Sequence, residues 1–126
     1  MATPTLSLRE HVELAPEFLD EADAEFAAGK TLKGAEMLWG AVAHALIAVA
    51  LRNGWPYNSH GALKRVAKQL PNVPGVSHWP TEFNVMERFH SHFYHGQRSG
   101  GRIARYRPRA RLFVARLLAV AQPAGG

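Results

Sequence analysis

The sequence predicts an all-α protein, an antiparallel up-and-down bundle of four main helices with short extra helical segments. Apolar residues recur at helical spacing along most of the 126 residues, and Ser, Thr, Pro and Gly stand where helices would begin or end. No run alternates between apolar and polar residues as a half-buried strand would. The length suits one domain with a hydrophobic core. We expect an N-terminal arm over residues 1–14, a single bundle over 15–122 and a disordered tail over 123–126.

Pro16 is expected to open the first main helix, because a missing N–H costs nothing in a first turn. That helix should end near Gly29, and the preceding Leu6–Leu14 would form a helical turn or an arm. Thr31 is the expected cap of a second helix, which stops at the Asn53-Gly54 pair. Because this second helix is apolar on nearly every side, we place it at the centre of the bundle.

A loop rich in Pro and Gly, residues 71–80, separates the third and fourth helices. Ser59 is the predicted N-cap of the third helix, over about 60–70, and Thr81 is that of the fourth, over about 82–95.

The last part of the chain is predicted to be a polar loop followed by a fifth helix. The loop would span Gln97–Arg107, and Pro108 would open a helix that reaches about Gln122.

The composition limits the cellular compartments that suit this chain and the kinds of site that it can form. The chain has no Cys, which excludes disulfides and thiolate metal sites and suits a reducing compartment. The first residues lack the basic start and apolar run of a signal peptide. The longest apolar stretch, Met37–Leu51, is shorter than the roughly 20 residues of a membrane span. We therefore expect a cytoplasmic protein with no membrane partner.

Charge is distributed unevenly along the chain. Residues 1–50 carry a net charge of −5 and residues 51–126 a net charge of +10. No acid follows Glu87, and seven arginines lie from Arg98 to Arg116. This asymmetry favours an anionic partner such as RNA or a nucleotide. A solvated basic face, or internal pairing with the acidic first helix, would explain it equally.

The predicted fourth helix carries the pattern most suggestive of function. At 100° per residue, one arginine and two histidines share a stripe about 60° wide, flanked by an amide and a hydroxyl, beside an apolar packing face. Arginine offers a fixed charge and a planar fork of donors, whereas histidine exchanges a proton near neutral pH. These are the groups that phosphate chemistry requires, although a solvated face could also hold them. The polar residues are Asn84, Arg88, Ser91, His92 and His95.

This arrangement resembles the HEPN superfamily of small all-helical proteins. Residues 25–44 are similar to the first helical hairpin of HEPN-type proteins, including an archaeal repeat-associated group. Tyr57–His60 precedes the third helix, and Arg88 is followed after six residues by His95, which fits the Arg-x4–6-His pattern of the superfamily. The resemblance covers about residues 15–120.

The resemblance implies two kinds of role. Some HEPN proteins are metal-independent endoribonucleases, commonly toxins paired with a nucleotidyltransferase-type antitoxin, and others are noncatalytic modules that bind a nucleotide or a partner. Homodimers that bring two motif helices together are common in both. Many HEPN ribonucleases have a polar residue directly after the Arg, whereas Phe89 follows Arg88 here. Both interpretations therefore stay open.

For a ribonuclease, His95 is the candidate base that removes the proton of a 2′-hydroxyl. Arg88 would stabilise the negative charge that develops on the phosphate, and His92 would protonate the leaving oxygen or position the phosphate. No cofactor is needed. Candidate RNA- or phosphate-binding residues are Asn84, Ser91, Arg98, Arg102, Arg105 and Arg107.

The remaining histidines have more ordinary explanations. His44 lies on the most apolar helix and is expected to be a hydrogen-bonded core residue, and His60 is expected to pack at the start of the third helix. Both are accessory site candidates. A metal bound by His92 and His95, joined by either of these, is a further alternative. We expect no metal, because an arginine in the same stripe would repel a cation.

Overall fold

The computed structural model describes residues 6–70, 84, 87 and 100–121 of the chain, the first six residues of the last range by their backbone. Within this part every regular element is an α-helix, so the predicted all-α class is confirmed. Asn84 and Glu87 are also helical, while the rest of the predicted fourth helix lies outside the described residues. The elements are α1 (Leu8–Ala27), α2 (Thr31–Asn53), α3 (His60–Gln69) and α5 (Gly100–Ala121).

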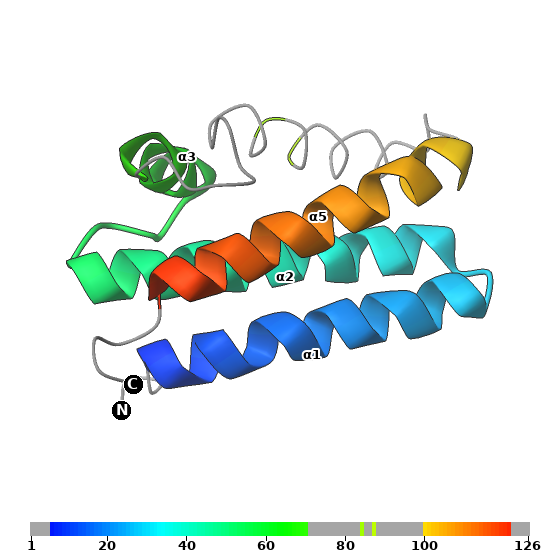
Figure 1. The fold of residues 1–126 in the computed structure, drawn as a ribbon, viewed down its shortest axis with the longest axis horizontal. Coiled ribbons are helices and arrows are strands. Elements are labelled where there is room, and N and C mark those ends of the chain that lie inside the picture. The colour runs from blue at the N-terminus through cyan, green and yellow to red at the C-terminus, as the bar shows by residue number, and fades with distance from the viewer. Residues whose placement is uncertain (1–5, 71–83, 85–86, 88–99, 122–126) are drawn as a thin grey trace.

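Helices α1 and α2 form an antiparallel hairpin, and α5 lies against α2 and runs in the same direction as α2 (Figure 1). The short helix α3 lies beside the C-terminal part of α2 (Figure 1). As predicted, α2 is the central helix: ten of its 23 residues are buried, against four of the 20 in α1. Its partners across the core include Leu19 of α1, Val66 of α3, and Phe113 and Leu117 of α5.

The prediction that Pro16 opens the first helix is wrong, because α1 begins at Leu8 and contains Pro16. The start is set by a capping box. The Ser7 hydroxyl accepts a hydrogen bond from the Glu10 N–H at 3.1 Å, and the Glu10 carboxylate accepts one from the Ser7 N–H at 2.9 Å. Residues 8–14 are therefore the first two turns of α1 rather than a separate arm. Pro16 is exposed.

The boundaries of α2 and α3 follow the prediction closely. Gly54 ends α2 with a φ of 71°, a left-handed conformation that favours glycine. Thr31 is the first helical residue of α2, however, and not its cap, since Lys30 holds the cap position without a side-chain hydrogen bond. Ser59 caps α3 by accepting a hydrogen bond from the Ala62 N–H at 3.0 Å, as predicted.

Helix α5 begins earlier than predicted. It starts at Gly100, so most of the expected Gln97–Arg107 loop is helical and Pro108 lies inside the helix. Arginine and alanine are strong helix formers, and they continue the helix across the segment that its polarity alone marked as a loop. Pro108 is exposed, so its ring faces away from α2.

By length and composition alone, α2 could cross a membrane, with a mean hydropathy of 1.6 over an 18-residue window. In this structure 56% of that window is buried inside the protein. The same composition is expected of the central helix of any small bundle, so it says little about location.

Candidate functional site

The stripe that the sequence singled out falls mostly outside the described residues. Arg88, Ser91, His92, His95 and Arg98 all lie there, so their roles stay predictions. Asn84 is a half-buried helical residue. Arg102 and Arg105 belong to the first turns of α5, where the structure describes the backbone.

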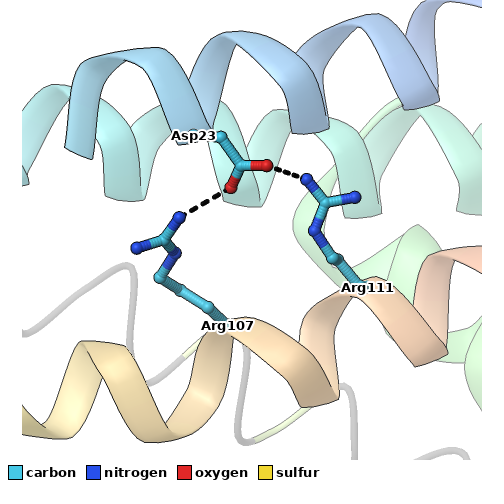
Figure 2. Close-up of polar contacts among 3 residues, drawn as sticks. All are labelled: Asp23, Arg107 and Arg111. Carbon is cyan, nitrogen blue, oxygen red and sulfur yellow. Dashed lines mark hydrogen bonds and ion pairs between the residues drawn. The ribbon is translucent and has the colours of Figure 1, made fainter. Parts of the chain in front are cut away.

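Arg107 is the predicted phosphate-binding arginine whose side chain the structure describes. It lies on α5 and faces Asp23 of α1, with its Nη2 2.7 Å from the Asp23 Oδ1. Arg111, one helical turn further along, donates from its own Nη2 to the other oxygen, Oδ2 (Figure 2). The carboxylate of Asp23 thus bridges two guanidinium groups. For these two arginines, the alternative of internal pairing with the acidic first helix is the one that the structure shows.

The Asp23 cluster is further ordered by an aromatic ring. The guanidinium carbon of Arg107 lies 4.3 Å from the centroid of the Phe26 ring, a cation–π contact. Phe26 is on α1, one turn after Asp23, so one face of α1 supplies both the ring and the carboxylate. The side chains remain partly open to water, at 42% exposed for Asp23, 35% for Arg107 and 44% for Arg111.

Electrostatics in this cluster favour the ionised carboxylate. Partial burial works to raise the pKa of Asp23, but the hydrogen bonds and positive charges of Arg107 and Arg111 outweigh it and hold that pKa below its ordinary value. A groove of about 370 Å³ opens beside the three side chains and is lined by them and by Pro108. The arrangement can hold an anion that offers two oxygens on one centre.

His60 lies at the N-terminus of α3 beside the chain segment that carries the predicted motif. Its Nδ1 is 3.3 Å from the Glu87 Oε2, and its ring centroid lies 5.3 Å from that of Trp39 on α2. Glu87 immediately precedes Arg88 in the sequence. On a helix these two neighbours would point about 100° apart, so the Glu87 contact does not place the Arg88 side chain. The His60 side chain is 58% exposed, so it contacts Trp39 and Glu87 at the surface of the protein.

His44 has a partner that the sequence analysis missed. Its Nδ1 lies 2.9 Å from the Nδ1 of His11, and its ring meets the edge of Phe18 with centroids 4.8 Å apart. His11 is 5% exposed. Burial lowers the pKa of both imidazoles, and for His11 the neighbouring His44 lowers it further, so the pair is predominantly neutral at pH 7. One ring then donates its Nδ1–H and the other accepts.

A signal for His11 was present in the chain. His11, Ala15, Leu19 and Ala22 follow the i, i+4, i+8, i+11 pattern of a buried helical stripe, and all four are buried. Placing the helix start at Pro16 removed the first two members of that stripe. Asp23 offered no comparable signal, because it is one of several acids on α1 and its partners lie more than 80 residues away.

No group of three His, Asp or Glu side chains that could hold a metal ion occurs among the residues that the structure describes. His11 and His44 form only a pair. The alternative of a metal bound by His92 and His95 concerns residues outside that part of the chain.

Comparisons with family models, with curated proteins and with solved structures give no match to this chain. The functional assignment therefore depends on the residues and their geometry.

Proposed function

We propose that this chain is an HEPN-like RNA-binding protein that cleaves RNA without a metal ion through Arg88 and His95. The observation that carries the proposal is the run of basic residues after Glu87, in which no acid intervenes and much of which lies along α5. RNA binding by such a basic segment would depend on phosphate contacts, so we expect it to weaken with salt and to show little sequence preference.

The cleavage chemistry needs three groups. His95 takes the proton of the 2′-hydroxyl, and the freed oxygen attacks the adjacent phosphorus. Arg88 stabilises the added negative charge on the phosphate oxygens. The bond from phosphorus to the 5′-oxygen breaks, and His92 gives that oxygen its proton. The products are a 2′,3′-cyclic phosphate and a free 5′-hydroxyl, and acid–base assistance of this kind contributes ~10²–10⁴-fold to the rate.

The described contacts support this proposal in one respect. His60 lies 3.3 Å from Glu87, the residue before Arg88, and its ring lies 5.3 Å from that of Trp39 on α2, so one contact joins the residue before the predicted motif to α3. We further propose that two chains pair as a cytoplasmic homodimer, with a nucleotidyltransferase-type protein as antitoxin. A symmetric dimer would bring two Arg88–His95 pairs together and raise the local positive charge.

The test is cleavage of mixed cellular RNA by the purified protein in EDTA, beside Arg88→Ala and His95→Ala. Arg9→Ala is a matched control, because the Arg9 side chain is 88% exposed at the start of α1. We expect cyclic-phosphate ends from the wild type and from the Arg9 variant, and none from the other two. If all four proteins are equally folded by circular dichroism and none cleaves RNA, the ribonuclease is refuted.

A noncatalytic role is the second candidate, and Phe89 favours it. An apolar side chain stands directly after Arg88, where many HEPN ribonucleases have a polar one. In that case the basic face would bind a nucleotide or a partner protein without cleaving it. RNA binding that persists in Arg88→Ala and His95→Ala, with no cleavage by the wild type, would identify this role.

A further inference from the structure

The cluster of Asp23, Arg107 and Arg111 has the geometry of an occupied anion site. Two guanidiniums from successive turns of α5 converge on one carboxylate from α1, and each takes a different oxygen (Figure 2). A phosphate group presents two or three oxygens on one centre in a similar way, and arginine pairs bind it through the same forked donors. The two carboxylate oxygens of Asp23 thus lie where two oxygens of a bound phosphate would lie.

Three features distinguish this cluster from an ordinary surface ion pair. The Arg107 guanidinium is held over the Phe26 ring at 4.3 Å, which restricts its orientation before any ligand arrives. The groove of about 370 Å³ lies directly beside both arginines and is large enough for a phosphate group. Within the cluster itself, the two arginines exceed the single carboxylate by one positive charge.

We propose that this groove is a phosphate-binding site in which Asp23 is an internal competitor, displaced when a phosphate binds between Arg107 and Arg111. The proposal rests on the proposed RNA-binding function for the identity of the ligand, an RNA backbone phosphate, and a mononucleotide phosphate shares the same chemistry. Each guanidinium carries five N–H donors, and Asp23 engages one terminal nitrogen of each. Exposed ion pairs of this kind contribute little net free energy, so exchange of the carboxylate for a phosphate is feasible.

Removal of the competing charge should therefore strengthen binding. In Asp23→Asn the side chain keeps its size and loses its negative charge. A unit charge about 4 Å from a phosphate in a high-dielectric setting changes a binding constant about five-fold, so we expect a gain of that order. The measurement is fluorescence anisotropy of a labelled 2′-O-methyl oligonucleotide at low salt, with AMP in a parallel titration. The 2′-O-methyl group blocks cleavage, so binding is measured apart from the ribonuclease chemistry.

Asp20→Asn is the matched control, because it removes the same charge from an exposed position one turn earlier on α1. Arg111→Gln tests whether the gain acts through this arginine pair: the effect of Asp23→Asn on binding should disappear when this second substitution is present. Asp23→Ser provides a second variant that also lacks the charge. A gain for the oligonucleotide assigns the site to the RNA backbone, and a gain for AMP alone assigns it to a nucleotide.

The proposal is overturned if folded Asp23→Asn and Asp23→Ser bind both ligands no more tightly than Asp20→Asn does, or if neither ligand binds at all. It is also overturned if the gain survives Arg111→Gln. These outcomes are separate from those of the cleavage assay. If Arg88→Ala abolishes cleavage and Asp23→Asn does not change binding, the ribonuclease is supported and this site is refuted. If Asp23→Asn strengthens binding and no protein cleaves RNA, this site is supported and the ribonuclease is refuted.

Discussion

Gly40 allows α1 and α2 to approach closely, and its replacement by alanine provides a quantitative test of the packing. A Cβ at this position would lie 2.5 Å from Cδ2 and 2.7 Å from Cε2 of the Phe18 ring. The ring cannot simply withdraw, since its edge is packed against His44 at a centroid distance of 4.8 Å. Alanine in a helix interior is favoured over glycine by about 0.5–1 kcal/mol, whereas overpacking costs about 1–3 kcal/mol. We therefore expect Gly40→Ala to lower the free energy of unfolding by up to roughly 2.5 kcal/mol, the difference of these two effects.

Urea denaturation followed by circular dichroism would measure this change, with Gly61→Ala as the control. The nearest atoms to a Cβ on Gly61 are 3.8 Å away, so this substitution should be neutral or stabilising by up to about 1 kcal/mol. In a Phe18→Ala background the clash is gone, and Gly40→Ala should become stabilising. The reasoning is refuted if Gly40→Ala stabilises the wild type as Gly61→Ala does, or if its cost is unchanged without the Phe18 ring.

Two further predictions follow from the core. The ordinary histidine pKa is 6.5, and burial lowers it for His11 and His44 in the folded protein, so the unfolded chain binds more protons as pH falls below that value. The contribution of the pair to the free energy of unfolding should be complete above pH 6.5 and fall as pH drops through the lowered pKa values. The free energy of unfolding should therefore differ less between pH 7.5 and pH 5 in a His11→Leu/His44→Leu variant than in the wild type. An equal difference in the two proteins would contradict the pairing. Phe113, at 1% exposed, fills the contact between α5 and α2, so Phe113→Ala should cost about 3–5 kcal/mol in the same assay. A loss below about 1 kcal/mol would show that this ring is not in the core.

Local signals in the chain were sufficient for most of the helical architecture. The apolar periodicity of Thr31–Asn53, its glycine stop at Gly54 and the Ser59 cap all concern residues within a few positions of one another. Such signals act through backbone hydrogen bonds that span three or four residues, so the sequence displays them directly. The starts of α1 and α5 were predicted wrongly because a local signal, a proline, was taken to mark a first turn. A proline can occupy the interior of a helix at the cost of one backbone hydrogen bond, as at Pro16 and Pro108, so a proline alone does not distinguish a first turn from an interior turn.

By itself, therefore, the sequence determined the all-α class, the central helix, the uneven charge and the predicted Arg88–His95 pattern. Only the tertiary structure decided which polar side chains meet: His11 with His44 across 33 positions, and Asp23 with Arg107 and Arg111 across more than 80. Helix periodicity states which face a residue occupies, but the rotation and crossing of packed helices decide its neighbour on the next helix. Pairing between distant charges and imidazoles depends on that packing, and no local pattern along the chain encodes it.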